Sequence, residues 1–350
     1  MSALRVDLGV LATNIARVRE RVAPARVMLV VKDDAYGHGL EPVVRRAHHE
    51  GVRWFGAFDV ATASRVRAVT GGGARIFAWI AASRSELDAA IGDDVDLGVG
   101  DAELLEEVAE AAREAGATAR VHLKIDSGLH RNGVRPEEWP AFAVRAAELV
   151  RSGCLDVVGL WSHIAEASDE EDDAARGIFE RAVEQARSAG LTPELLHLSA
   201  SAASFARAEF RYDLVRVGAF CYGIRPAGGP DERELQIQPV GRLEATVADL
   251  TDDRAVIDVG ALDGLPSTLG GRVSLTVDGA PRRLLTVGPR SEVEAWPNAA
   301  VGDALTVYGA PDGPSATDFA EAIGTIGEEI AVRVSPLVER IYTGDPAPQH

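Results

Sequence analysis

An alternation of short apolar runs with longer helical stretches, over the first two-thirds of the chain, constrains its fold most. Eight runs rich in apolar and β-branched residues predict strands, and apolar residues at helical spacing fill most of the segments between them. One helical segment begins at a capping Asp101, places Leu105 and Val108 on one face and ends at Gly116. The eight predicted strands are Val27–Lys32, Trp54–Phe58, Ile76–Trp79, Val95–Val99, Ala119–Asp126, Val157–Ile164, Leu195–Ser199 and Leu214–Ala219.

Eight strands that alternate with helices favour a (β/α)8 TIM-like barrel over a doubly wound sheet. After Pro226 the pattern changes to short alternating runs with turn signals such as Asp278-Gly279, which predicts a C-terminal all-β domain. We therefore predict an α/β barrel over residues 5–226 and a β domain over residues 235–343, with an N-terminal strand at 3–8 packing with the latter. We expect disorder in the tail from Thr343 to His350.

Composition narrows the function. The chain carries 36 basic and 54 acidic side chains, and a net charge of −18 argues against nucleic-acid binding. No run of about 18 apolar residues predicts a membrane span, and the N-terminus lacks a signal-peptide pattern. Two isolated cysteines, Cys154 and Cys221, fit a reducing cytoplasm. The two cysteines are isolated, and no histidine pair has metal-ligand spacing. His48 and His49 are adjacent and would point to different faces of a helix. We expect a cytoplasmic protein without metal, membrane or nucleic-acid partner.

Lysine is rare in this chain: Lys32 and Lys124 stand against 34 arginines. Lys32 ends the first predicted strand, and barrel enzymes keep their chemistry at the carboxyl ends of their strands. Tyr36 and the turn Gly37-His38-Gly39 follow it. A lysine that can lose its hydration shell is also the residue that forms Schiff bases with carbonyl groups.

The segment Val30–Gly39 resembles the pyridoxal-phosphate (PLP) lysine motif of the alanine racemase family, the fold-type III PLP enzymes. The resemblance runs from Arg5 to about Tyr342. It implies a PLP-binding barrel with a C-terminal β domain, a head-to-tail homodimer and a small amino-acid substrate. It also implies that PLP is bound covalently to Lys32 and that Tyr36 contacts its phosphate.

Motifs at the later strands extend the resemblance. Val121–Gly128 matches the fifth-strand motif, which implies that Arg131 contacts the PLP phenolate and the substrate carboxylate side. Lys124 falls on a lysine that some members carry as a carbamate, which orients that arginine. Gly159–His163 ends the sixth strand and places His163 close to the cofactor ring.

The seventh- and eighth-strand motifs complete the implied cofactor site. His197 and Ser201 lie in the seventh motif, with Ser201 as a phosphate ligand. In the eighth, Arg216 is expected to face the pyridine nitrogen, and the amides of Gly218 and Ala219 to bind phosphate. Each of these residues alone fits an ordinary structural role. Together at five strand ends they favour a PLP site, with Lys32, His163, Arg131 and Arg216 as its catalytic residues.

Other positions depart from the family. Asn is usual where Ala200 stands, and the partner-subunit tyrosine that supplies the second base corresponds to Ala261, between Gly260 and Asp263-Gly264. A second partner-supplied segment, usually containing Met-Asp, falls near Leu284–Glu294 without that pair. Glu328 replaces a β-domain tyrosine that normally reaches the phosphate, and we expect its carboxylate to point away.

Three hypotheses follow. The preferred one is one-base chemistry at Cα of a β-substituted amino acid, such as aldol or retro-aldol cleavage with His163 as general base, or decarboxylation. The second is an amino-acid (alanine) racemase with another second base, either His163 or water. The third is a PLP carrier without turnover, which the retained β domain disfavours.

Overall fold

The computed structural model describes residues 2–166 and 168–344. The predicted disorder of the tail is wrong for Thr343, which belongs to the strand Glu339–Thr343 and pairs with Asp7, and residues 345–350 fall outside the described residues. The chain forms two compact units. One comprises Val18–Lys32 and Gly51–Gly218, and the other comprises Met1–Arg17, Asp33–Glu50 and Ala219–His350. The domain boundaries at 5–226 and 235–343 stay a prediction.

The first unit contains the predicted barrel. Its eight strands are all parallel to their neighbours in the order β8-β7-β6-β5-β4-β3-β2-β9. The amides of Asp213 and Arg216 donate to the carbonyls of Leu196 and Ser199 (3.1 and 3.3 Å), which joins β9 to the β8 end. This closure confirms the barrel. The strands are β2 Arg26–Val30, β3 Trp54–Asp59, β4 Arg75–Ile80, β5 Asp96–Val99, β6 Ala119–Lys124, β7 Leu155–Trp161, β8 Leu195–His197 and β9 Leu214–Val217.

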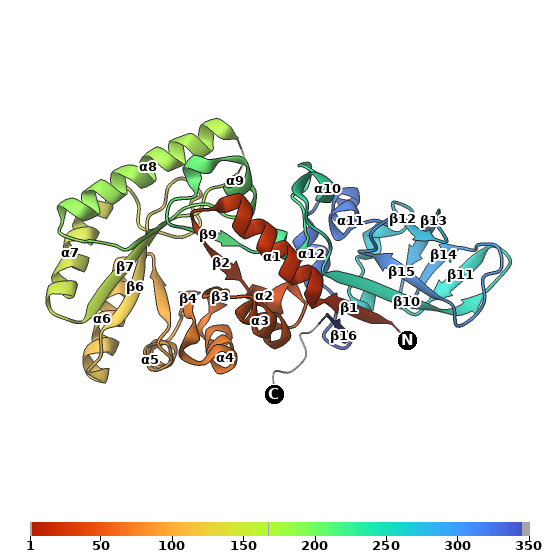
Figure 1. Ribbon diagram of the computed structural model, residues 1–350, viewed down its shortest axis with the longest axis horizontal. Coiled ribbons are helices and arrows are strands. Elements are labelled where there is room, and N and C mark those ends of the chain that lie inside the picture. Colours follow the sequence, from red (N-terminus) through yellow and green to blue (C-terminus); the bar gives the residue numbers. More distant parts are fainter. Residues whose placement is uncertain (1, 167, 345–350) are drawn as a thin grey trace. The chain divides into compact units, whose positions relative to one another are not determined.

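Helices α5 to α8 flank these strands on the outside (Figure 1). Local signals set their ends: the Asp101 carboxylate accepts from the Leu104 amide (2.8 Å), and Gly116 ends the helix in the left-handed conformation, as predicted. No helix among the described residues has the length and apolar character to cross a membrane. The helices are α4 Val60–Thr70, α5 Arg84–Gly92, α6 Ala102–Ala115, α7 Trp139–Arg151, α8 Asp169–Ser188 and α9 Ser201–Ala206.

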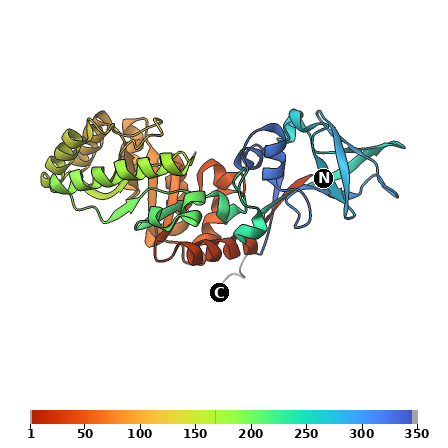
Figure 2. The same ribbon diagram turned by 90° about the horizontal axis from the view of Figure 1, so that it is seen from above.

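The other unit contains a mixed sheet in the order β12-β13-β14-β11-β10-β1-β16, with β15 paired to β10. Its cyan and blue strands stand together in Figure 2. The hairpin between β12 and β13 turns at Asp278 and Gly279, both with positive φ, as tight hairpins require. The strands are β1 Ala3–Asp7, β10 Gly241–Leu250, β11 Arg254–Ile257, β12 Ser274–Val277, β13 Ala280–Val287, β14 Ser291–Glu294, β15 Ala304–Tyr308 and β16 Glu339–Thr343.

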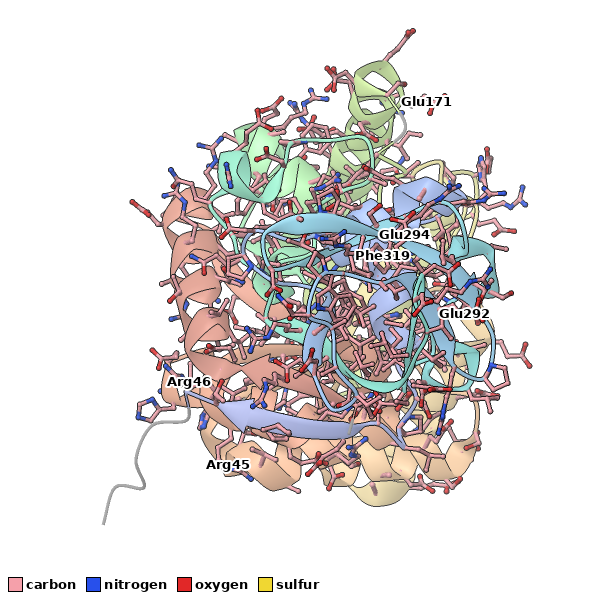
Figure 3. The ribbon with its side chains drawn as sticks, turned by 90° about the vertical axis from the view of Figure 1, so that its right-hand side faces the viewer. Arg45, Arg46, Glu171, Glu292, Glu294 and Phe319 are labelled. Carbon is pink, nitrogen blue, oxygen red and sulfur yellow. The ribbon has the colours of Figure 1, made fainter. Side chains whose placement is uncertain are left out.

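Helices in this unit include two that the alternating pattern does not predict, α11 and α12. Phe319 of α11 is fully buried and packs on Tyr308 of β15 (ring centroids 5.8 Å apart), whereas Glu292 lies at the periphery (Figure 3). The helices are α2 Lys32–Tyr36, which begins in the barrel unit, α3 Leu40–His49, α10 Glu232–Leu235, α11 Ala316–Ile323 and α12 Gly327–Val332. Helix α1, Leu8–Val22, passes from this unit into the other.

Candidate active site

The barrel brings the predicted site residues to the carboxyl ends of its strands. Lys124 ends β6, His197 ends β8, and Arg216 lies in β9. Lys32 and His163 each stand two residues beyond a strand. Arg216 Nη2 lies 3.1 Å from His163 Nδ1. Lys124 Nζ and the Arg216 guanidinium lie 4.5 and 5.1 Å from the centroid of the Trp161 ring. The charges of Lys32 and Lys124 also act on His163.

Arg216 is buried and held on several sides. Its Nη1 donates to the Nδ1 and to the carbonyl of His197, both at 3.1 Å. Its Nη2 donates to the carbonyls of Ser162 (2.8 Å) and Leu198 (3.0 Å) and to His163 Nδ1 (3.1 Å). Within the described part of the chain no hydrogen bond engages its Nε–H. Burial and then the charge of Arg131 lower the pKa of Arg216 to about 9, so it is charged at neutral pH.

His163 is a neutral hydrogen-bond donor in this arrangement. A guanidinium has no acceptor, so His163 Nδ1 must accept from Arg216 and the proton of the neutral ring sits on Nε2. Burial, followed by the charges of Arg216 and Arg131, holds the pKa of His163 well below its ordinary value. An imidazole in this state can donate through Nε2–H but cannot readily accept a proton.

Lys124 is almost fully buried at the end of β6. Its Nζ lies 4.5 Å from the centroid of the Trp161 ring, an arrangement that favours a cation. Burial and the charges of Arg216 and Arg131 lower the pKa of Lys124, and they outweigh the Asp126 carboxylate, which raises it. The pKa of Lys124 therefore falls to about 8.

The loop that carries Arg131 takes its shape from Asp126. One Asp126 oxygen accepts from the amides of Gly128 (3.1 Å) and His130 (3.0 Å), and the other meets His130 Nδ1 at 3.0 Å. Arg131 is exposed beyond this loop, yet its charge acts on Lys124, His163 and Arg216. Arg131 thus adds a positive charge to the surroundings of His163 from a loop that the hydrogen bonds of Asp126 hold.

Hydroxyl and amide groups follow β8 and β9. Ser199 Oγ is buried beside Arg216 and has no hydrogen-bond partner among the described residues. Ser201 is the first residue of α9, and its neighbour Ala200 offers no amide side chain. Gly218 follows β9 and ends the barrel unit, whereas Ala219 belongs to the other unit.

The turn after Lys32 is left-handed. Asp33, Asp34 and Ala35 have φ between 53° and 56° with ψ near 50°, and Tyr36 has φ of 56°. Non-glycine residues avoid this region at a cost of about 1–2 kcal/mol each, so the surrounding structure must hold them there. The amide of Gly37 donates to the carbonyl of Asp33 at 2.8 Å and closes one turn.

Tyr36 is buried in its own unit. Its ring lies 4.7 Å from that of Tyr222, and His38 stacks on Tyr222 at 5.1 Å. Burial and then the charge of Glu328 raise the pKa of Tyr36, which keeps its hydroxyl protonated. Glu328 therefore lies close enough to Tyr36 to act on it. Whether its carboxylate points away from a bound phosphate stays a prediction.

Ala261 lies in a rigid turn. Its amide donates to the carbonyl of Gly288 (2.7 Å), and the Gly260 amide donates to the Asp263 carboxylate (2.8 Å). Gly264 has φ of 112°, and a Cβ there would stand 2.1 Å from the carbonyl oxygen of Arg333. The flanking residues therefore preserve the backbone of the turn, while the exposed position 261 carries only a methyl group.

Comparisons with known proteins fit this geometry. The family described as alanine racemase, N-terminal domain, matches residues 6–226. The chain belongs to the alanine racemase family. It is 38% identical to an alanine racemase of Beutenbergia cavernae and 37% identical to one of Thermobifida fusca, over 97% of each chain. The alanine racemase structure from D-cycloserine-producing Streptomyces lavendulae has 30% identity and a TM-score of 0.94, covering 99% of this chain and 97% of that one.

Family membership identifies the protein as a PLP-dependent enzyme, because members of the alanine racemase family use covalently bound PLP. The barrel residues fit such a group. Lys32, Lys124, Arg131 and Arg216 gather positive charge that suits a phosphate and a carboxylate. The buried Ser199 hydroxyl has no hydrogen-bond partner among the described residues and is a polar group that a bound ligand can satisfy. The hydrogen bonds of Arg216 to described residues use Nη1 and Nη2, which leaves its Nε–H available to a ligand as well.

Two residues of the site escape the sequence-based prediction. Asp96 and His122 connect to His197 by buried hydrogen bonds. Both lie in predicted strands, where the alternation of side chains marks the inward-facing positions. A polar residue at such a buried position indicates a specific hydrogen-bond partner. The sequence does not reveal which partner, because the three residues come from different strands.

Proposed function

We propose that this family member acts at Cα of a β-substituted amino acid by one-base chemistry, with Lys32 as the covalent attachment point of PLP and the only acid–base residue at Cα. When bound, PLP weakens bonds at Cα by conjugating them with its ring. The rigid turn that presents Ala261 carries this proposal. A methyl group cannot transfer a proton, and it leaves room beside Cα for a larger substrate side chain.

The other barrel residues would bind and orient. Arg131 would hold the substrate carboxylate side and the cofactor phenolate, and Arg216 would donate its Nε–H to the pyridine nitrogen. Ser201 and the backbone amides of Gly218 and Ala219 would bind the phosphate. These assignments rest on the strand-end positions of the residues and on the hydrogen bonds that fix Arg216.

Tyr36 and Lys124 have supporting roles in the proposal. Tyr36 would donate its hydroxyl to the phosphate, because its raised pKa keeps the proton in place. Lys124 would carry a carbamate that attracts Arg131, since its lowered pKa leaves part of the amine neutral and reactive.

His163 supports binding rather than proton abstraction. With Nδ1 accepting from Arg216 and the proton on Nε2, it has no free site for a proton. This weighs against His163 as the base for a β-hydroxyl group and equally against it as a second base for racemisation. Decarboxylation, or cleavage in which another group takes the hydroxyl proton, needs only Lys32 at Cα.

Racemisation with a different second base, such as water, is the alternative that the names of the relatives favour. A PLP carrier is disfavoured because the match to the relatives spans both units rather than the barrel alone.

The decisive experiment incubates the holoenzyme with D- and L-amino acids, including β-hydroxy amino acids, in deuterated water. Cα exchange, inversion, aldehyde and carbon dioxide are scored separately. Exchange with retention, or release of aldehyde or carbon dioxide, is expected, and rapid inversion of alanine would refute the proposal. Lys32→Ala should lose the absorbance of bound PLP on dialysis, and a variant that keeps it would refute the attachment point.

We also propose a head-to-tail homodimer. Leu262, beside Ala261, is 79% exposed and Leu337 is 93% exposed, so the unit that carries the turn presents apolar side chains to solvent. Light scattering on the purified holoenzyme should give twice the chain mass. An active monomer would contradict this assembly.

A further inference from the structure

Four buried side chains form a continuous hydrogen-bonded series across the barrel interior. Asp96 begins β5, His122 lies in β6, His197 ends β8 and Arg216 lies in β9. Asp96 Oδ2 lies 3.2 Å from His122 Nε2, and His122 Nδ1 lies 2.8 Å from His197 Nε2. His197 Nδ1 lies 3.1 Å from Arg216 Nη1. We call Asp96, His122 and His197 the relay.

Only one placement of the protons satisfies all three bonds with neutral rings. Arg216 can only donate, so His197 Nδ1 accepts and its proton sits on Nε2. That Nε2–H donates to His122 Nδ1, which leaves the proton of His122 on Nε2. The His122 Nε2–H then donates to the carboxylate of Asp96. Burial, and then His122 and Arg216, hold the pKa of His197 well below its ordinary value, which agrees with a neutral ring.

Asp96 is a fixed anion at the far end. Arg75 Nη2 and Arg120 Nε each approach its carboxylate to 2.6 Å. Burial raises the pKa of Asp96, but the hydrogen bond from His122 and the hydrogen bond and charge of Arg75 outweigh it and hold the pKa below its ordinary value. The carboxylate is therefore ionised at neutral pH.

Packing alone does not require these histidines. The ring of Phe77 lies 4.7 Å from that of His122 and 5.5 Å from that of His197, so the same space suits apolar side chains. The chain instead opposes His122 with Gly159, where a Cβ would stand 2.2 Å from His122 Nδ1. Buried polar groups are costly unless they are paired, so a specific role must favour them.

We propose that Asp96, His122 and His197 are positioning residues for Arg216. The anion makes each imidazole in turn a stronger acceptor, and this holds Nη1 in place. The guanidinium is thereby oriented with its Nε–H left over as the donor for the pyridine nitrogen. The effect on the cofactor rests on the proposed role of Arg216, whereas the proton arrangement does not.

Two substitutions cut the relay at different links. In His122→Asn the amide oxygen replaces Nδ1, so the bond from His197 remains and the link to Asp96 is lost. In His122→Gln the amide nitrogen replaces Nε2, so the link to Asp96 remains and the bond from His197 is lost. Phe77→Leu is the matched control, because it perturbs packing on both histidines and removes no hydrogen bond.

The first measurement is nitrogen-15 NMR of wild-type holoenzyme labelled at histidine. It should show His122 and His197 as neutral rings with the proton on Nε2. A proton on Nδ1 of His197, or a charged ring, would overturn the relay. This result does not depend on PLP, so it separates failure of the relay from failure of the proposed function.

The second measurement reconstitutes each variant with PLP labelled at the pyridine nitrogen. Both His122 variants should move that resonance towards the position of a pyridine without a hydrogen bond. They should also weaken PLP binding about tenfold, the effect of one lost hydrogen bond. Phe77→Leu should lower only the melting temperature. An unchanged pyridine resonance in both His122 variants, or an equal change in Phe77→Leu, would refute the positioning role.

Discussion

Lys124 should react with carbon dioxide to form a carbamate, and the site explains why. A buried amine beside Arg131 and Arg216 is poorly placed to carry a third positive charge, and its pKa falls to about 8. At pH 7 roughly one amine in ten is then neutral, against roughly one in three thousand for an ordinary lysine. The neutral, reactive fraction is thus raised roughly 300-fold, and the product is an anion that Arg131 and Arg216 stabilise.

The assay is carbon-13 NMR of the protein equilibrated with labelled bicarbonate. Only two lysines and the terminal amine can form a carbamate, so assignment is simple. Lys124→Arg keeps the charge and the stacking on Trp161 but cannot react, and it should abolish the main signal. Lys32→Arg is the matched control and should keep it. The signal should fall about tenfold for each pH unit below about 8.

The result that would refute this reasoning is a carbamate signal that is absent from wild type under saturating bicarbonate, or one that survives Lys124→Arg. Either would mean that the positive cluster at the ends of β6 and β9 is stabilised by other means.

Further predictions concern stability and the altered turn. Burial lowers the pKa of His38 to about 4, so the free energy of unfolding decreases as pH falls from about 6.5 towards 4. In urea melts, the free energy of unfolding of wild type minus that of His38→Asn should be about 2 kcal/mol lower at pH 5 than at pH 7. Gly159→Ala should lower the free energy of unfolding by about 1–3 kcal/mol, because the added Cβ collides with His122. Gly177→Ala in α8 is the control and should raise the free energy of unfolding by up to about 1 kcal/mol. Equal melting temperatures of the two variants would contradict this prediction. Ala261→Tyr should give the enzyme a measurable rate of alanine inversion, followed by chiral chromatography. An unchanged inversion rate would contradict the hypothesis that Ala261 replaces the tyrosine that serves as second base.

The barrel was predictable because local sequence signals mark its strands and the ends of its helices. Asp101 caps α6 with its own carboxylate, and Gly116 ends it with a conformation that other residues avoid. The positions of Lys32, Lys124 and Arg216 at strand ends followed, because parallel strands bring their carboxyl ends to one face of a barrel.

Other features were not predictable, because they depend on contacts between distant segments. The left-handed turn at Asp33–Tyr36 contradicts local preferences and persists only in its packed surroundings. The proton state of His163 depends on Arg216, which lies 53 residues further along the chain. The sequence suggested His163 as a general base, and only the hydrogen bond argues against that role.

The stereochemistry of exchange at Cα tests the central claim most directly. The holoenzyme is incubated with each enantiomer of an amino acid in deuterated water, and deuterium incorporation and configuration are measured in the same sample. With Lys32 as the only acid–base residue at Cα, deuterium should enter with retention and inversion should be far slower. Inversion of alanine as fast as exchange would contradict the account.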